Sequence, residues 1–489
     1  MSINSSELIV ANDDSFRIRV LIVTSLGAFL TPFTSSLISF AVPKIASTFH
    51  SNFTDIVWVP MAYLIALPTF MILLGRLSDM YGRIRFYRIG FIVFSFGTLL
   101  ASIASNIYFL ILSSFVMGFG GALIGTNSTA IISLVYPKEK RGWALGINAM
   151  SVYLGLTMAP VLGGILTQFF PWQAIFIINI PIALVALVLT FIYMKRTRID
   201  EIRKKEKIDS IGSLIFTGSI FSIVLYLSLG QIYNFFSTIY LLVIGLALIV
   251  TFVFFERHIE NPMLDISLFT TNRTFSAANF TAFLNYVSTF SITFIFSIFL
   301  QIILGYSPFS AGMILMIEPI LMVVFSPISG KMSDKYGSRG IASAGMLIIA
   351  IAFFILAFIN GKSGILSMII PLGILGIGFG LFSAPNTNSV MGSVSSNKVG
   401  VASGTLGTMR FTGQLLSLAL ASAILSVSIP HSMLIQIFSG VTVKSGIDAS
   451  TFENGFRAIM IFSGILSLIG SYTSLLRTKR QITNKNGDV

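Results

Sequence analysis

Apolar stretches of about 20 residues recur along almost the whole chain, and no other feature constrains its fold as strongly. Inside a bilayer the backbone must satisfy its own hydrogen bonds, so such stretches form helices. We identify fourteen runs, at 20–40, 57–75, 86–105, 107–132, 143–168, 174–194, 210–230, 235–255, 275–304, 312–330, 340–360, 363–388, 400–428 and 457–476. The sequence therefore predicts an all-α membrane protein with fourteen spans.

Composition supports this class and argues against an enzyme. The chain is 55% hydrophobic and only 10% charged, whereas soluble proteins carry about 25% charged residues. It contains three His and no Cys, which excludes disulfides and thiolate metal sites. It also lacks a phosphate-cradling Gly-Lys-Ser/Thr loop and paired carboxylates within its spans. We therefore expect no catalytic activity, no metal and no cofactor.

The basic residues are distributed very unequally between the two sides of the membrane. With these spans, 26 of the 31 Lys and Arg residues lie on the side of the termini, four lie opposite and Arg410 lies within a span. Cytoplasmic loops are enriched in Lys and Arg, so both termini are predicted to be cytoplasmic in a multi-pass plasma-membrane protein. The net charge of +13 is then an orientation signal, and we expect no nucleic-acid binding.

An internal duplication relates the two halves of the chain. Gly-Arg-Leu-Ser-Asp-Met-Tyr-Gly at Gly75–Gly82 returns as Gly-Lys-Met-Ser-Asp-Lys-Tyr-Gly at Gly330–Gly337, with five of eight positions identical. A second pair relates the glycines and the alanine of Gly142–Gly146 to those of Gly400–Gly404. Both copies of the first segment connect two apolar runs. Repeated halves around a central site are typical of secondary transporters.

The duplication also predicts the domain organisation. Two six-helix halves account for twelve runs, and the remaining two are inserted between them. The predicted parts are an N-terminal tail at 1–19, a first half at 20–194, a basic linker at 195–209, two inserted helices at 210–255, a linker at 256–274, a second half at 275–476 and a tail at 477–489.

These residues resemble the major facilitator superfamily, specifically its fourteen-helix drug:proton antiporter branch, over about residues 17–480. The family's loop motif Gly-x-Leu-Ser-Asp-x-x-Gly-Arg matches Gly75, Leu77, Ser78, Asp79, Gly82 and Arg83. The antiporter motif of the fifth helix matches Gly146, Gly155, Ala159, Pro160, Gly163 and Gly164, with Ala159 in place of a glycine. The resemblance implies a major facilitator fold of two pseudo-symmetric six-helix bundles plus two inserted helices, which rock about a midplane site.

The resemblance also implies that the loop motifs act as gates. Asp79 follows a helix end beside basic residues, where it can accept hydrogen bonds from the start of a neighbouring helix and pair with Arg83. The corresponding residues of the second half are Gly330, Asp334, Gly337 and Arg339. The motif glycines allow close helix approach, so plain packing and gating are both open roles for them.

Two charged positions of the branch are changed. Thr34 stands where the first helix usually carries Asp, and Ser114 stands where the fourth helix usually carries Arg. Of the 18 acids only Glu318 lies well within a span, and intramembrane ionisable residues usually face a bundle interior. We predict Glu318 as the proton-coupling carboxyl, with a structural hydrogen bond next to Pro319 as the alternative. Arg410 pairs with Glu318, binds a substrate anion or lies near the cytoplasmic end.

Polar side chains on several spans suggest a substrate cavity. The candidates are Thr31, Thr34, Ser35, Asn127, Asn148, Tyr153, Asn285, Tyr286, Asn386 and Arg410. Each could instead make an interhelical hydrogen bond. The leading hypothesis is a monomeric, proton-coupled exporter of amphipathic or drug-like small molecules. The alternatives are an uncoupled or symporting carrier of a polar metabolite, such as a sugar or organic anion, and a non-transporting receptor or scaffold.

Overall fold

The computed structural model describes residues 14–49, 53–194, 209–233, 235–259, 262, 264, 266–300, 304–306, 308–361, 363–395, 398–428 and 449–478. Nearly all of the predicted basic linker, and most of both predicted tails, lie outside these residues. All regular secondary structure in the described part of the chain is helical.

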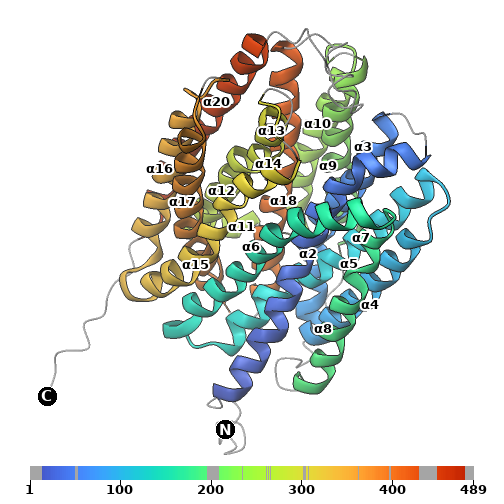
Figure 1. Cartoon of the computed structure of the whole chain (residues 1–489). Helices are drawn as coiled ribbons and strands as arrows, with labels where there is room; N and C mark the ends of the chain where they lie inside the picture. The colour runs from blue at the N-terminus through green and yellow to red at the C-terminus, as the bar shows by residue number, and fades with distance from the viewer. Residues whose placement is uncertain are drawn as a thin grey trace, which may run out of the picture.

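The helices of the first half are α2 (Asp14–Phe49), α3 (Phe53–Tyr81), α4 (Arg83–Ser102), α5 (Ile107–Val135), α6 (Lys138–Phe169), α7 (Ala174–Ile177) and α8 (Asn179–Tyr193). The two inserted helices are α9 (Ser210–Tyr233) and α10 (Ile239–His258), and the short α11 (Ile266–Thr271) follows them. The second half comprises α12 (Arg273–Thr289), α13 (Ser291–Ile298), α14 (Pro308–Leu315), α15 (Ile317–Tyr336), α16 (Ser338–Leu356), α17 (Ile365–Gly392), α18 (Val399–Ser428) and α20 (Ala449–Leu475) (Figure 1).

Eleven helices in the described residues are long and apolar enough to cross a membrane, which makes this a multi-pass membrane protein. The other three predicted spans coincide with α9, with α12 and α13 together, and with α18. The predicted span 275–304 is divided at Phe290, between α12 and α13. The total of fourteen spans is compatible with this arrangement and stays a prediction.

The duplicated loops have the same backbone geometry. Gly82 separates α3 from α4 with a φ of 105°, and Gly337 separates α15 from α16 with a φ of 85°. Residues with a Cβ are strained at such angles. Each glycine N–H closes the preceding helix, on the carbonyl of Ser78 or Ser333 at 3.0 Å. The repeated glycines therefore allow two long helices to reverse direction with almost no connecting chain.

The two halves lie side by side in Figure 1, and each has a hydrophobic core of its own. Between the halves, α3 packs on α18 and α15 packs on α6. The second helix of each half thus meets the fifth helix of the other. The inserted helices α9 and α10 pack on each other, and α9 contacts α3 and α18.

Candidate functional site

A carboxylate latch joins α3 to the start of α18. Asp79 Oδ2 accepts a hydrogen bond from the Val401 N–H at 3.2 Å, and the carboxylate also accepts one from the Gly400 N–H. Arg83, from the first turn of α4, forms a buried ion pair with Asp79. The free N–H groups at a helix start favour an anion. Because Arg83 belongs to the same half as Asp79, the charge of this latch is neutralised within the first half.

A second latch joins α15 to the start of α6. Asp334 accepts hydrogen bonds from the N–H groups of Gly142 and Trp143, both at 2.9 Å. Asn388 on α17 adds a longer contact to Asp334 Oδ1 at 3.3 Å. The cation that acts on Asp334 is Arg141 of α6, so it comes from the opposite half. Arg339 is the predicted counterpart of Arg83. Its backbone carbonyl accepts a hydrogen bond from the Ser474 hydroxyl at 3.4 Å.

We call the end of the molecule that carries both latches the latch end. The start of α2 lies there too, because Lys140 and Asp14 approach to 3.9 Å. Glycines bring the two halves into backbone contact at this end. A Cβ on Gly330 would collide with the carbonyl oxygen of Gly142, and one on Gly75 with that of Gly400. The two halves are therefore closed against each other at the latch end.

The antiporter-motif helix is α6, and its glycines serve two different contacts. A Cβ on Gly146 would lie 2.8 Å from the Ser326 carbonyl oxygen of α15, whereas one on Gly155 would lie 2.6 Å from that of Phe29 on α2. Ala159 is buried in the first core. The Gly163 carbonyl accepts a hydrogen bond from Thr167. Pro160 and Gly164 lie on α6 as well.

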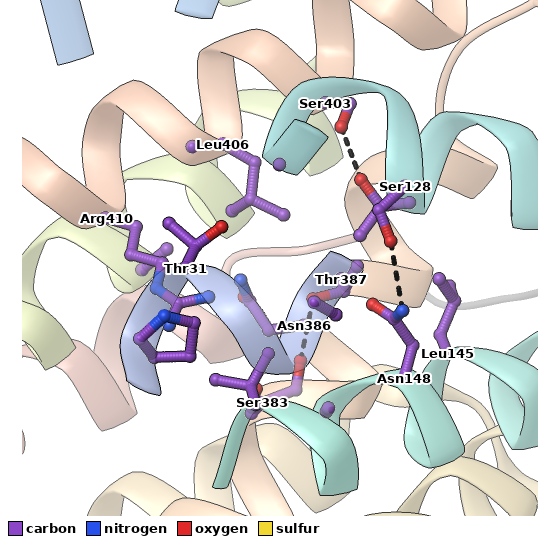
Figure 2. Close-up of a pocket in the computed structure, with 18 of the residues that line it drawn as sticks. Thr31, Ser128, Leu145, Asn148, Ser383, Asn386, Thr387, Ser403, Leu406 and Arg410 are labelled. Carbon is purple, nitrogen blue, oxygen red and sulfur yellow. Dashed lines mark hydrogen bonds between the residues drawn. The ribbon is translucent and has the colours of Figure 1, made fainter. Parts of the chain in front are cut away.

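A cavity of about 100 Å³ lies between the two halves (Figure 2). It is lined by Ala28, Thr31, Pro32, Met71, Gly125, Ser128, Thr129, Leu145, Asn148, Ala149, Val152, Tyr153, Ala282, Tyr286, Phe382, Ser383, Asn386, Thr387, Ser403, Leu406, Gly407, Arg410 and Phe411. Hydroxyls and amides provide most of its polar groups. Figure 2 shows Ser128 and Asn148 on one side of the cavity, with Thr31 and Arg410 on the other.

Six of the ten predicted cavity residues line this space: Thr31, Asn148, Tyr153, Tyr286, Asn386 and Arg410. The other four lie outside the lining and have local contacts. The Thr34 hydroxyl bonds to Asn179 at 2.7 Å, and that of Ser35 to the Pro32 carbonyl at 3.0 Å. The amide of Asn127 donates to the Leu123 carbonyl at 2.8 Å, and that of Asn285 to Met346 Sδ at 3.3 Å.

Aromatic rings from both halves and one cation, Arg410, form part of the cavity wall. The rings of Tyr153 and Tyr286 both meet Phe379 edge-on, with centroids 5.6 Å apart in each pair. The Arg410 guanidinium carbon lies 5.2 Å from the Tyr286 ring centroid and 5.3 Å from that of Phe411. Such distances correspond to cation–π contact.

Glu318 is buried on α15, with 5% of its surface exposed, but it does not line the cavity. A Cβ on Gly376 would collide with its carbonyl oxygen, so α15 and α17 are in close contact at this residue. Glu318 acts electrostatically on Tyr153, whose side chain also hydrogen-bonds to Ser383. The carboxyl is therefore close enough to act electrostatically on a lining residue, although it does not line the cavity itself.

Arg477, just beyond α20, is a cation that the sequence assigned to the C-terminal tail. Only 2% of its surface is exposed. It donates hydrogen bonds to Asn386 Oδ1 and, at 3.2 Å, to Ser389 Oγ. Burial lowers the pKa of Arg477 to about 9. Arg477 thus fixes the amide oxygen of a cavity residue from behind.

Comparisons with known proteins identify the family of this chain. The family model described as Major Facilitator Superfamily matches residues 24–418 and 278–488. The chain belongs to the major facilitator superfamily. It is 30% identical over 447 residues to the riboflavin transporter RibZ of Clostridioides difficile (strain 630), covering 91% of this chain and 96% of RibZ. It is also 30% identical over 433 residues to multidrug resistance protein 3 of Bacillus subtilis (strain 168), covering 87% and 82%.

The fold agrees with solved members of the superfamily. The crystal structure of the human organic anion transporter MFSD10 superposes with a TM-score of 0.66 at 14% identity, covering 94% of this chain and 99% of that one. The predicted membership of the major facilitator superfamily and the predicted all-α membrane fold are both confirmed. The superfamily and these relatives are transporters, so the prediction of a transporter and not an enzyme is confirmed as well.

Several cavity residues of this superfamily member were missed in the sequence. Ser128, Thr129, Ser383, Thr387 and Ser403 all line the cavity. Ser and Thr occur throughout these helices, and many of them bond to a carbonyl one turn back, as Thr387 does to Ser383 at 3.0 Å. Nothing in the sequence distinguishes the lining hydroxyls from the others. The structure also places the two positions at which the chain departs from the family pattern. The Thr34 hydroxyl bonds to Asn179, and Ser114 is fully buried on α5.

Proposed function

We propose that this chain is a monomeric plasma-membrane exporter that carries amphipathic, drug-like small molecules through the central cavity by alternating access, in exchange for protons. Both termini are cytoplasmic in this proposal, so the latch end faces the cytoplasm. The observation that carries the proposal is the polar cavity between the halves. Two latches accompany it, and each joins the second helix of one half to the fifth helix of the other. A cavity placed between two bundles is the arrangement that a rocking transporter requires.

The size of the cavity supports movement of the halves. Its volume of about 100 Å³ is well below the roughly 300–1,000 Å³ of sites for drug-sized ligands. A substrate of that size therefore needs the halves to move apart. Because both latches are formed, this conformation represents a state closed toward the cytoplasm. Opening toward the cytoplasm requires Asp79 and Asp334 to leave the helix starts that they contact.

Glu318 is the group that we assign to proton coupling. Its carboxyl acts on Tyr153, which lines the cavity. Ionisation of Glu318 therefore changes the electrostatic environment of a substrate-contacting ring, without direct contact between carboxyl and substrate. Its burial on a helix that packs against α6 of the other half makes its protonation state sensitive to movement between the halves.

A second candidate function is transport of a polar metabolite without export of drugs. It is favoured by the relative named as a riboflavin transporter, which aligns over 91% of this chain. The multidrug resistance relative, aligned over 87%, supports the first candidate. Both candidates use the same cavity, and they differ in the chemistry of the substrate.

Flux measurements in liposomes test the proposed function. Purified protein is reconstituted with a pH gradient, and uptake of riboflavin and of fluorescent drug-like dyes is followed with and without a protonophore. We expect gradient-driven flux of at least one compound. In Glu318→Gln, gradient-driven flux should be lost while substrate-for-substrate exchange persists.

The matched control is Glu453→Gln, since Glu453 accepts a hydrogen bond from Gly361 at the exposed start of α20. It should retain gradient-driven flux. If Glu318→Gln remains fully gradient-driven, the coupling role fails. If wild-type protein moves no compound in any of these assays, the transport proposal for these substrate classes fails.

A further inference from the structure

The substrate class is indicated by Arg410, a cation on the cavity wall without a carboxylate counter-ion. Within the described part of the chain, no Asp or Glu oxygen lies within ion-pair distance of its guanidinium. Its Nε atom is buried and has no hydrogen-bond partner there. Ionised groups in a membrane interior are costly, and they normally pair with an opposite charge. The position of Arg410 therefore calls for an anionic partner.

Glu318 does not supply that partner in this conformation. It lies outside the lining, whereas Arg410 lies within it, and no ion pair joins the two among the described residues. The contacts of Arg410 are instead the faces of Tyr286 and Phe411, which hold the planar guanidinium by cation–π interaction. Among the described residues no group accepts a hydrogen bond from the Arg410 guanidinium, so its N–H donors are available to a ligand.

The rest of the cavity reinforces this positive character. Arg410 is the only lining side chain, among those of the described residues, that carries a full charge at neutral pH. A second cation, Arg477, lies directly behind the lining residue Asn386. A lipophilic cation entering this space would meet two positive charges and no carboxylate on the wall. An anion would gain charge-assisted hydrogen bonds from Arg410.

The shape of the wall adds a second requirement. Tyr153 and Tyr286 are fixed edge-on against Phe379, so their positions are defined by packing. Aromatic walls favour flat ring systems, which stack on or meet them edge-on. Across the cavity from Arg410, Ser128 and Asn148 are available for neutral hydrogen bonds (Figure 2).

We propose that Arg410 determines substrate specificity by binding an anionic group of a planar aromatic substrate. The rings of that substrate would lie against Tyr153 and Tyr286. This inference rests on the proposed function, since it takes the cavity to be the transport site. It excludes lipophilic cations as preferred substrates. The carboxylate, phenolate or enolate of an aromatic acid is the chemistry that Arg410 would recognise.

Two dyes with the same tricyclic xanthene core and opposite charge test whether Arg410 selects anionic substrates. Fluorescein is anionic at pH 8, and rhodamine 123 is cationic. Binding of each to detergent-purified protein is measured by fluorescence polarisation, and flux is measured separately in liposomes. Wild-type protein should bind fluorescein at least about ten-fold more tightly than rhodamine 123, because a hydrogen bond to a charged group contributes roughly that factor or more.

Three variants separate the role of the charge from that of the fold. Arg410→Gln should weaken fluorescein binding about ten-fold or more and leave rhodamine 123 binding unchanged or tighter. Arg410→Lys keeps the charge but loses the planar fork, so its affinity for fluorescein should be intermediate. Arg457→Gln is the control, since Arg457 is an exposed arginine on α20 that donates to the Ala357 carbonyl. It should bind both dyes as wild type does.

Each outcome decides between the two proposals. Wild-type preference for rhodamine 123, binding of neither dye, or fluorescein binding unaffected in a folded Arg410→Gln protein would overturn the assignment of Arg410. Proton-driven flux of rhodamine 123 with no fluorescein binding would keep the proposed transport function and remove the anion site. Tight, Arg410-dependent fluorescein binding without any flux would keep the anion site and remove the proposed transport function.

Discussion

The substitution Asp334→Asn at the second latch gives a quantitative test of the proposed separation of the two halves. In the structure Asp334 Oδ1 accepts from the Gly142 N–H and Oδ2 from the Trp143 N–H, both at 2.9 Å. An asparagine has a single acceptor oxygen, so one of these N–H groups would face an amide donor. A hydrogen bond to a charged group contributes about 1.5–3 kcal/mol. Each 1.36 kcal/mol is a factor of ten, so the latched state should lose roughly 10- to 150-fold in population relative to the open state.

The chain contains no cysteine, which makes a thiol-labelling assay direct. Ala149→Cys places a thiol on the cavity wall. In inside-out vesicles, the rate of its reaction with a membrane-impermeant maleimide should rise by about the same factor when Asp334→Asn is added. Glu139→Gln, a change of an exposed acid in the first turn of the same helix α6, should leave the rate unchanged. An unchanged labelling rate in a correctly folded Asp334→Asn protein would refute the latch argument.

Three further predictions concern the frame around the site. Asp79→Asn should lower thermal stability by about 3–5 kcal/mol, because the buried Arg83 guanidinium loses its charge partner; a shift in the melting temperature no larger than that of Asp334→Asn would contradict this. Gly337→Ala should cost about 1–3 kcal/mol in the same assay, since its φ of 85° is strained for alanine, and an unchanged melting temperature would show that the loop relaxes. Asp209→Ala should destabilise α9 by about 1 kcal/mol, because Asp209 accepts a hydrogen bond from the Gly212 N–H at 2.8 Å; Asp209→Asn, which can still cap the helix, should melt close to wild type.

The duplication was the part of the molecule that the sequence predicted best. Gly142 and Gly400 were related by their spacing alone, and in the structure each lies at a helix start that holds a motif carboxylate. The pattern could not tell which helices meet. That Asp334 contacts α6, and Asp79 contacts α18, depends on packing between residues that are 191 and 322 positions apart. A repeat gives the internal symmetry of a chain, but not the partners across it.

Charged residues show where sequence reasoning stops. Arg477 follows the last apolar run among other basic residues, so it was assigned to a solvated tail. Its burial against Asn386 depends on the end of α20 reaching α17. Similarly, Asn127 and Asn285 lie within spans as expected, but their side chains bond to their own or a neighbouring helix. The direction of a polar side chain around a helix decides its role, and an apolar run long enough to be buried on all sides does not encode that direction.

The two latches differ in the half that supplies their cation, and in the proposed alternating-access movement this difference determines how each latch responds to opening. Asp79 keeps Arg83 when the halves separate, because both belong to the first half. Asp334 loses Arg141 together with the N–H groups of α6. In the proposed movement, the free-energy cost of the open state therefore falls mainly on the second latch. Arg83 is the first residue of α4, and the equivalent first residue of α16 is Ser338.

Ser338→Arg should therefore give Asp334 a cation in its own half. The benefit is largest in the open state, since Arg141 already acts on Asp334 in the latched one. Labelling of Ala149→Cys in inside-out vesicles should become several-fold faster, with Ser338→Gln as the uncharged control at wild-type rate. Slower labelling in Ser338→Arg would mean that the added cation stabilises the latched state more, and that the origin of Arg141 in the opposite half does not limit opening.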